Sequence, residues 1–412
     1  MSEGRPAPGR AAEASAALPL PLSLFAVTAP GLESVAAAEL QALGIVRLRV
    51  THGGVEFEGT WEDLGRANLE LRSVGRVLLR VGSFRAAGFE ELRRRASRLP
   101  WESFLAPGDA LSLRVACHKS RLYHSGGVAE RVVQAAQLRL GFAPAHAPAP
   151  GDDAEPAAIC VSEPLPRAQL VLVRLDHDQC TVSVDTSGEM LHRRGYREAT
   201  GRAPLRETLA AALLLASGWD ARTPLLDPFC GAGTIAIEAA LLARRRAPGR
   251  ERRFAFMDWR SFDAAGYEKL LAQVDARAEA APPPPYIGAS DRDAGALAAA
   301  AANAVRAGVE ADLTLSQRTL SDVVPPPGPG FVVTNPPHGV RLSRGRDLRD
   351  LYAKLGQVLR ARCPGWHVAL LCPGPRLWSA SGLALEPRLR VLHGGLRLTL
   401  VTGVVPLAAR GA

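Results

Sequence analysis

The front of the chain alternates between two patterns of apolar residues. Apolar residues at every second position predict strands, and apolar residues three and four positions apart predict helices. In chain order these patterns predict a strand at 24–28, a helix at 31–43, strands at 46–50 and 54–58, a helix at 61–71 and a strand at 76–81. Strands and helices interleaved in this way predict a small ferredoxin-like α+β unit.

A second α+β segment follows. Its pattern predicts a helix at 89–99, a strand at 111–116, a helix at 128–140 and strands at 169–175 and 180–185. Residues 143–156 are rich in Pro, Ala and Gly, so we interpret them as a loop. Residues 186–203 are polar, contain glycine and are strongly basic, which is typical of a linker.

The back half of the chain reads as an open α/β sheet. Pro204 opens a predicted helix that runs to residue 217, since the first helical turn tolerates proline well. After it the pattern predicts strands at 225–227, 286–291, 312–316, 331–334 and 366–372, with helices at 234–240, 293–307 and 348–362 between them. The last two strands, 385–392 and 396–404, are joined at Gly394-Gly395. A plain dinucleotide-binding fold would cross over with a helix there, so this hairpin predicts a different sheet.

One turn of this sheet has candidate binding chemistry. The stretch from Asp227 to Thr234 reads strand, turn with two glycines, helix. Gly231 and Gly233 have no Cβ, so a ligand can approach the backbone closely. The helix that follows offers unpaired N–H groups at its N-terminus. A tight structural turn would look the same, so this stretch alone leaves binding and structure equally supported.

Two other strand ends strengthen the prediction. Asp291 ends the second strand of the sheet, where an acid suits a pair of ribose hydroxyls. Asn335-Pro336-Pro337-His338 follows the strand at 331–334. In an open α/β sheet these strand ends gather at one edge, where ligands bind. Three such elements in this order predict a binding site far more specifically than any one of them.

The charge balance points to a polyanionic partner. The chain has 412 residues, enough for two or three domains, and its 47% hydrophobic content can build their cores. Its net charge is +9 and its pI about 9.7, which favours nucleic acid. The basic residues proposed as RNA contacts are Arg193, Arg194 and Arg197 of the linker, and Lys119 and Arg121 beside Tyr123 and His124. There are two alternative explanations of the basic charge. The residues could form an ordinary solvated basic surface, or a high-GC genome could encode Arg in place of Lys and Ala at many positions.

The cysteines and the apolar runs indicate whether the protein has a metal site, which compartment it suits and whether it crosses a membrane. The six cysteines form no Cys-x-x-Cys pair and have no histidine cluster beside them, so the sequence predicts no metal site. Scattered cysteines suit a reducing compartment, and we expect a cytoplasmic protein. No apolar run approaches the roughly 18 residues of a membrane-spanning helix, so we expect no membrane partner. We read residues 1–21 as a flexible tail and expect a monomer.

Together the motifs resemble a known family. Asp-Pro-Phe-Cys-Gly-Ala-Gly-Thr at 227–234 with Asn-Pro-Pro at 335–337 resembles class I S-adenosylmethionine-dependent methyltransferases that modify amino groups. The form of the motif at 227–234 is similar to that of THUMP-domain RNA N2-guanine methyltransferases, most of all the bacterial 23S rRNA type. The same similarity extends to three other stretches, at 28–33, 191–197 and 203–210. The resemblance covers roughly residues 22–405.

The resemblance implies a division into domains and a function. It implies a ferredoxin-like domain at 22–88, a THUMP RNA-binding domain at 89–185, a basic linker at 186–203 and a class I methyltransferase domain at 204–407. The implied function is methyl transfer to the N2 amino group of a guanine in RNA, with S-adenosyl-L-methionine as cofactor. The RNA is 23S rRNA or its precursor, with tRNA as the alternative.

The resemblance also assigns the site residues. The implied catalytic residues are Asn335, Pro336, Pro337 and His338; the implied cofactor contacts are Asp227, Phe229, Cys230, Gly231, Gly233, Thr234, Asp291, Arg292, Thr319 and Asn335. In methyl transfer most of the catalysis is positioning. The Asn335 side-chain carbonyl and the Pro336 peptide carbonyl can accept both hydrogens of an amino group and aim its lone pair at the methyl group.

Two positions depart from the family pattern and keep alternatives open. His338 stands where Tyr or Phe usually stacks on the flipped base, and Thr319 stands where an acid near the adenine is expected, with Asp322 close by. An amino methyltransferase acting on DNA adenine or on protein glutamine would use a similar loop. A non-catalytic RNA-binding or ribosome-assembly factor that keeps the fold is the third alternative, supported only by His338.

Overall fold

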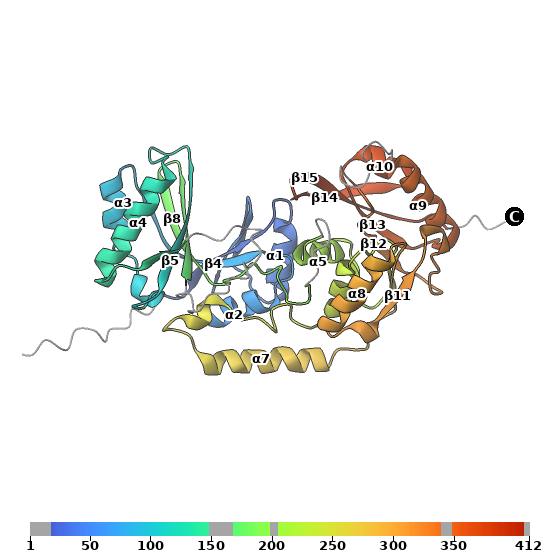
Figure 1. Ribbon diagram of the computed structural model, residues 1–412, viewed down its shortest axis with the longest axis horizontal. Helices are drawn as coiled ribbons and strands as arrows, with labels where there is room; N and C mark the ends of the chain where they lie inside the picture. Colours follow the sequence, from blue (N-terminus) through green and yellow to red (C-terminus); the bar gives the residue numbers. More distant parts are fainter. Residues whose placement is uncertain (1–17, 148–167, 198–204, 339–347, 408–412) are drawn as a thin grey trace, which may run out of the picture. The chain divides into compact units, whose positions relative to one another are not determined.

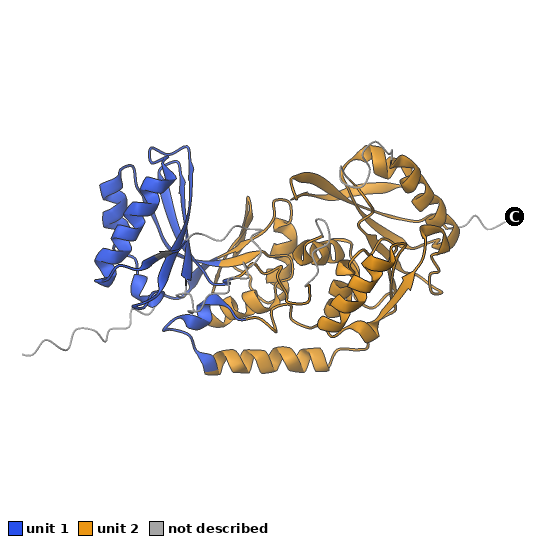
Figure 2. Ribbon diagram, viewed as in Figure 1, with its two compact units in different colours: residues 1–24, 78–188, 253–264 blue, residues 25–77, 189–252, 265–412 orange. Residues whose placement is uncertain are grey.

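The chain divides into two compact units. The computed structural model describes residues 18–147, 168–197, 205–338 and 348–407. Unit 1 consists of residues 1–24, 78–188 and 253–264; unit 2 consists of residues 25–77, 189–252 and 265–412 (Figure 2). The boundary falls inside strands β1 (Leu22–Val27) and β4 (Arg76–Arg85). The predicted ferredoxin-like segment 22–88 therefore contributes residues to both units.

Unit 1 is a mixed sheet with two helices on one face (Figure 1). Its strands lie in the order β4-β8-β7-β5-β6. The bounds of the added strands are β5 (Ala110–His118), β6 (Ala145–Ala147), β7 (Ala168–Asp176) and β8 (Gln179–Asp185). Strands β5 and β7 are parallel, whereas β7 and β8 form an antiparallel hairpin. The helices are α3 (Phe89–Ala96) and α4 (Ser125–Leu140), and a 3-10 turn spans Trp101–Ser103.

The returning segment 253–264 is fixed to unit 1 by aromatic side chains. It contains the 3-10 turn Ala255–Asp258. The indole N–H of Trp259 donates to Gln169 Oε1 at 2.7 Å, and its ring meets Phe104 edge-on at 4.9 Å. A buried indole with its N–H satisfied adds apolar contact without leaving a polar group unpaired.

Unit 2 begins with the small α+β elements of the front of the chain. These are α1 (Glu33–Ala42), β2 (Leu48–Thr51), β3 (Gly54–Gly59) and α2 (Trp61–Glu70), with β2 and β3 paired antiparallel. Arg72, which follows α2, is buried and donates to the carbonyl oxygen of Arg246 at 2.5 Å. A Cβ at Gly31 would lie 1.6 Å from the carbonyl oxygen of Arg390, so the loop before α1 touches the last hairpin directly. The front elements are thus packed onto the large sheet.

That sheet has the order β11-β10-β9-β12-β13-β15-β14. Its strands are β9 (Leu225–Asp227), β10 (Ile287–Asp291), β11 (Leu313–Gln317), β12 (Phe331–Thr334), β13 (His367–Cys372), β14 (Leu385–His393) and β15 (Leu396–Val404). Strands β9 to β13 pair in parallel, and β15 is antiparallel to both β13 and β14. The predicted Rossmann-like α/β sheet with a terminal hairpin is confirmed.

Helices cover both faces of this sheet. They are α5 (Glu207–Ala216), α6 (Thr234–Ala243), α8 (Ala294–Arg306), α9 (Arg349–Arg362) and α10 (Pro375–Ala380). Neighbouring strand residues belong to different cores: Leu225 packs with α5 and α6, whereas Leu226 packs with α9. Successive strand side chains point to opposite faces, so a sheet covered on both sides needs apolar residues at every position. This explains the short unbroken apolar runs of the sequence.

Three elements were missed by the sequence pattern. Strand β6 lies inside the segment interpreted as a loop, of which residues 148–156 lie outside the described chain. Helix α7 (Ala264–Glu279) buries only Leu270 and Val274, too few apolar positions for a clear period. Helix α10 has only 6 residues and no buried one. Most of the predicted tail at 1–21 lies outside the described residues, which begin at residue 18.

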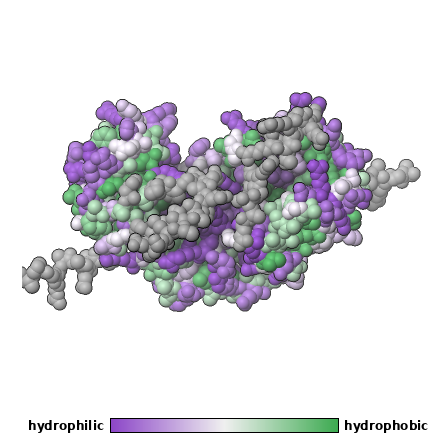
Figure 3. Space-filling view, in the orientation of Figure 1, coloured by the Kyte–Doolittle hydropathy of each residue, from purple (hydrophilic) through white to green (hydrophobic). Residues whose placement is uncertain are grey.

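Among the described residues, none of the helices combines the length and the apolar character that crossing a membrane requires. Hydrophilic and hydrophobic residues are interspersed over the visible face of each unit (Figure 3).

Candidate functional site

Three neighbouring strands of unit 2 end at the same edge of the sheet. The register aligns Leu226 of β9 with Gly288 of β10 and with Val332 of β12. Because the strands are parallel, their carboxyl ends lie together, which is where open α/β sheets bind ligands. The polar residues at these ends are Asp227, Asp291, Thr334 and Asn335. The strand-end prediction from the sequence is therefore met by the fold.

The turn after β9 is shaped by its two glycines. Gly231 has φ +51° and Gly233 has φ +82°, both in the left-handed region that favours glycine. A Cβ at Gly231 would meet nothing within 4 Å, so this backbone faces open space. A Cβ at Gly233 would lie 2.9 Å from Ala300 Cβ, so that glycine is needed for close packing of α6 against α8. The two glycines therefore have different tasks, access and packing.

Hydrogen bonds tie this turn to the neighbouring strand. Gly231 N donates to Asp291 Oδ2 at 3.0 Å, and Cys230 N donates to the Ser290 carbonyl at 3.0 Å. The Asp291 side chain is half-buried, and its Oδ1 accepts from Asp293 N at 3.0 Å. Cys230 is buried and burial raises the pKa of its thiol, so it stays protonated filler. Phe229 is half-buried, and Thr234 is buried at the start of α6.

Asp227 is a buried acid at the centre of the site. Its Oδ1 accepts from Thr334 Oγ1 at 2.5 Å and from Phe229 N at 3.2 Å. Burial, together with the smaller effect of the nearby Asp291 charge, raises the pKa of Asp227 to about 7. The Thr334 hydroxyl works in the opposite direction because it stabilises the ionised carboxylate. Asp227 thus joins the ends of β9 and β12, and Thr334 is a site residue that the sequence pattern did not indicate.

The loop after β12 presents an unsatisfied acceptor. Asn335 is half-buried, and its Oδ1 is a buried atom with no hydrogen-bond partner among the described residues. Pro336 is buried and Pro337 half-buried. His338 Nδ1 lies 2.8 Å from the Pro336 carbonyl oxygen, and burial lowers the pKa of this imidazole. The neutral ring therefore donates its Nδ1–H to one of the two expected acceptors.

The residues expected at the adenine end are exposed. Arg292 is exposed, and its carbonyl accepts from Gln317 Nε2 at 3.3 Å. Thr319 is exposed two residues after β11, and its hydroxyl donates to Asp322 Oδ2 at 2.6 Å. The acid Asp322 therefore sits beside Thr319.

Two of the proposed RNA contacts of the linker, Arg194 and Arg197, need correction. Arg194 has a side chain only 2% exposed, ion-paired with Glu238, and donates to the Arg72 carbonyl at 2.6 Å. Arg197, 12% exposed, pairs with Glu207 at 3.3 Å. Arg193 is half-buried, and its carbonyl accepts from Arg252. The basic run looked like a surface because the sequence does not show where its acidic partners, Glu238 and Glu207, fold.

Arg197 instead reaches the glycine turn. Its Nη2 donates to Thr234 Oγ1 at 2.8 Å and to the Leu205 carbonyl at 2.7 Å. Glu207, at the start of α5, is buried, and its Oε2 has no hydrogen-bond partner among the described residues. Burial raises the pKa of Glu207, and Arg197 opposes that effect. Glu207 is a site residue that sequence reasoning missed; a lone acid opening the apolar helix 207–216 was the available signal.

A second chain of hydrogen bonds supports the turn from behind. Tyr196 donates its hydroxyl to Glu238 Oε1 at 2.9 Å, and its carbonyl accepts from Arg306 Nε at 2.8 Å. Arg306 also donates to Asn303, whose Nδ2 donates to the Ala232 carbonyl at 3.0 Å. Asn303 is buried, and its place in an alanine-rich helix gave no sequence signal.

The other proposed RNA contacts belong to unit 1. Lys119 and Arg121 are exposed in the loop after β5, with Lys119 at φ +43°. Arg121 N donates to Asp178 Oδ1 at 2.7 Å, which fixes the loop while the guanidinium remains 75% exposed. Tyr123 and His124 are also exposed. This group fits the predicted accessible basic surface.

Comparison with known proteins gives consistent matches. Residues 194–384 match the family described as RMKL-like, methyltransferase domain, and residues 23–78 match the RlmL ferredoxin-like domain. The chain is 36% identical over 392 residues to the ribosomal RNA large subunit methyltransferase K/L of Syntrophotalea carbinolica, covering 92% of this chain and 53% of that protein. The chain thus spans about half the length of the curated K/L relatives it matches.

Two further relatives match over nearly their whole length. A candidate RNA methyltransferase of Synechocystis sp. is 33% identical over 92% of this chain and 95% of its own. The crystal structure of SMU.472 complexed with SAH superposes with a TM-score of 0.80 at 30% identity, covering 95% of this chain and 99% of that one. The chain therefore belongs to the RMKL-like methyltransferase family, which confirms the family resemblance of residues 227–234 and 335–337.

Proposed function

We propose that this chain transfers a methyl group from S-adenosylmethionine to the exocyclic N2 amino group of a guanine in RNA. The observation that carries the proposal is Asn335 Oδ1 at the carboxyl end of β12, a buried acceptor that has no hydrogen-bond partner among the described residues. A buried acceptor left unpaired costs free energy, so such an atom calls for a donor from outside the chain. An amino group supplies that donor.

The site fits the proposed cofactor, which supplies the methyl group when bound. The open space at Gly231 admits a ligand against the backbone. Asp291, half-buried with one bond on each oxygen, keeps lone pairs for the two ribose hydroxyls. Glu207 Oε2 is a buried acceptor suited to the ammonium of the methionine portion. At the adenine end, Arg292 and the Thr319–Asp322 pair are available.

Asn335 and Pro336 hold the amino group of the substrate. An exocyclic amine is a poor nucleophile because its lone pair is delocalised into the ring. Two carbonyl acceptors, Asn335 Oδ1 and the Pro336 oxygen, would accept hydrogen bonds from its two N–H groups and turn the lone pair toward the methyl group. The N–C bond forms as the S–C bond breaks, and the extra proton of the amine leaves to solvent. Thr334 and Asp227 hold the loop that carries these acceptors.

One observation favours a second function. His338 Nδ1 already donates to the Pro336 oxygen, so one acceptor of the pair is partly occupied. A non-catalytic RNA-binding factor that keeps the fold would tolerate this contact. A carbonyl oxygen has two lone pairs, so the substrate amino group can share that oxygen with His338. We favour the enzyme because no group in the described ranges pairs with the Asn335 acceptor.

The RNA is proposed to be large-subunit ribosomal RNA, acted on in the cytoplasm by a monomer. The support is the name of the K/L relatives together with the net charge of +9. We propose that residues 89–185 act as a THUMP RNA-binding domain through Lys119 and Arg121, and that 22–88, 186–203 and 204–407 are the ferredoxin-like domain, the linker and the methyltransferase domain. Transfer RNA is the alternative substrate.

Nucleoside analysis tests this function. We expect N2-methylguanosine to fall in 23S rRNA from a strain that lacks the gene and to return when the wild-type chain is supplied. An Asn335→Ala chain supplied at equal level should not restore it. Loss of the nucleoside from tRNA instead would select the tRNA alternative. An unchanged nucleoside profile in both RNAs would contradict the enzyme.

A further inference from the structure

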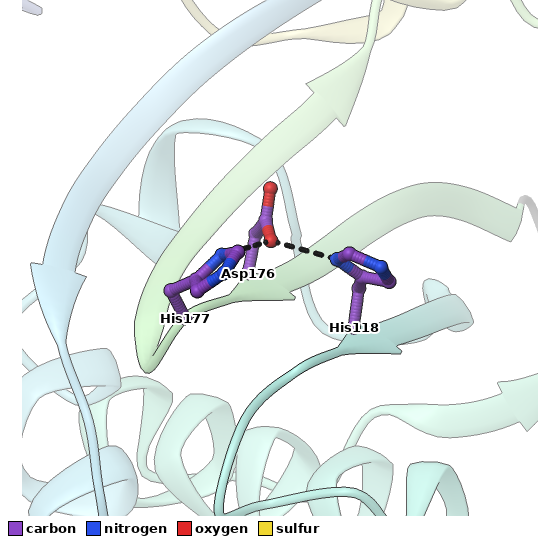
Figure 4. Close-up of side chains that lie close together, drawn as sticks. All are labelled: His118, Asp176 and His177. Carbon is purple, nitrogen blue, oxygen red and sulfur yellow. Dashed lines mark hydrogen bonds and ion pairs between the residues drawn. The ribbon is translucent and has the colours of Figure 1, made fainter.

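Two histidines and an aspartate from separated segments meet at the surface of unit 1. His118 ends β5, Asp176 ends β7, and His177 follows in the turn to β8. Each residue can offer one ligand atom, and these atoms lie within 4.8 Å of one another (Figure 4). This cluster is not visible in the sequence because 58 positions separate His118 from Asp176.

Strand register and turn geometry bring the three side chains together. His118 and Asp176 are direct partners in the parallel pairing of β5 with β7. His177 and the next residue, Asp178, have φ of +50° and +62°, the left-handed values of a two-residue hairpin turn. The loop after His118 is held in turn, since Ser120 donates to the His118 carbonyl and accepts from Asp178 N. The cluster is therefore built on paired strands rather than on a mobile loop.

The distances suit a single metal ion. His118 Nδ1 lies 3.0 Å and His177 Nδ1 2.8 Å from the same atom, Asp176 Oδ1. Ligand atoms bound at about 2.0–2.1 Å to one tetrahedral Zn²⁺ lie about 3.3 Å apart. A small outward shift of the two rings would thus make room for the ion. The side chains of His118, Asp176 and His177 are 62%, 38% and 67% exposed, so a metal ion can reach them from solvent without a rearrangement of the fold.

We propose that His118, Asp176 and His177 form a binding site for a divalent transition metal of the Zn²⁺ or Ni²⁺ class. Two imidazoles with one carboxylate suit these ions, whereas Mg²⁺ and Ca²⁺ prefer oxygen ligands. Arg174 Nη2 lies 3.4 Å from Asp176 Oδ2, so it orients the carboxylate to bind through Oδ1 alone. The same positive charge limits the affinity, and water completes the coordination.

Titration calorimetry of the untagged full chain with ZnCl₂ tests the site, with MgCl₂ as the metal control. We expect one Zn²⁺ per chain and no binding of Mg²⁺. His118→Ala and His177→Ala should each weaken Zn²⁺ binding about tenfold or more, because each removes one of three ligands. His52→Ala removes an exposed imidazole that lies outside the cluster and should leave Zn²⁺ binding unchanged.

Absence of Zn²⁺ binding by the wild-type chain would overturn the proposal. So would a doubly substituted His118→Ala, His177→Ala chain that binds Zn²⁺ as tightly as wild type. Electron paramagnetic resonance of Cu²⁺ on the wild-type chain needs no variant and should show two nitrogen donors. A Cu²⁺ spectrum without nitrogen coupling would contradict the assigned ligands.

Discussion

His338 Nδ1 donates a hydrogen bond to the Pro336 carbonyl oxygen across 2.8 Å. The imidazole that replaces the family's usual aromatic ring thereby contacts the acceptor proposed for the substrate amino group. Its ring is half-buried, and burial keeps it neutral by lowering its pKa. The substitution therefore does more than reduce stacking area, because it adds a donor that competes with the substrate.

Replacing His338 should relieve this competition. His338→Phe keeps a planar ring for stacking and removes the Nδ1–H, and His338→Tyr restores the usual residue. Stacking contributes roughly 1–3 kcal/mol per base, so both changes should hold or raise the single-turnover rate of methyl transfer. His338→Ala, which frees the carbonyl but removes the ring, should be slower than either. A rate that falls equally in all three variants would show that the imidazole itself is needed.

Asp291 provides a test of the cofactor site that does not depend on RNA. Asp291→Asn keeps the shape but removes the charge that would receive the ribose hydroxyls. A charge-assisted hydrogen bond is worth roughly 1.5–3 kcal/mol, so S-adenosylmethionine affinity should fall about ten- to a hundredfold. Calorimetric titration measures it. Asp350→Asn, which changes an exposed acid at the start of α9, should bind the cofactor as wild type does. Equal affinities in all three chains would reject the assignment of Asp291.

The buried charge pairs could not be predicted from the sequence. The elements of the large sheet could be predicted because unbroken apolar runs and glycine turns are local signals, as at 225–234 and 331–338. Arg194 and Glu238 are 44 positions apart, and only the fold shows that they are paired. Helix α7 was missed for a related reason. It has few buried apolar residues, and its ion pair between Arg277 and Glu70 joins residues that are far apart in the sequence.

The Arg194–Glu238 pair predicts a stability effect in place of the RNA contact. Both side chains are nearly inaccessible, at 2% and 0% exposure. Removing one partner of a buried pair leaves the other charge uncompensated, which costs about 3–5 kcal/mol. Arg194→Ala should therefore shift urea unfolding strongly toward lower concentration. Arg47→Ala, in a pair whose arginine is 77% exposed, should change it little. If Arg194→Ala weakened RNA binding without loss of stability, the original RNA assignment would stand.

Asp227 predicts a pH dependence of stability. Burial raises its pKa to about 7 in the folded chain, against about 3.9 for an unfolded aspartate. The folded state then holds the proton more tightly, so the Asp227 contribution is fully present below about pH 4 and is lost as pH rises through about 7. The loss is on the order of a few kcal/mol.

Asp227→Asn removes that titration and keeps an oxygen for the Thr334 hydroxyl. Urea midpoints of wild type and variant, measured from pH 4 to pH 8, should diverge in favour of the variant as pH rises and then run parallel. A constant difference across this range would mean that Asp227 does not titrate there.

Asn335 is proposed to hold the substrate amino group through a side-chain oxygen that has no hydrogen-bond partner within the described part of the chain. The most direct test of this proposal is single-turnover methyl transfer from labelled S-adenosylmethionine to unmodified 23S rRNA by wild type and Asn335→Ala, with cofactor affinity measured on the same samples. We expect a rate about 10²–10³-fold lower in the variant at unchanged cofactor affinity, the loss expected for one preorganised polar group. Equal rates in the two chains would contradict it.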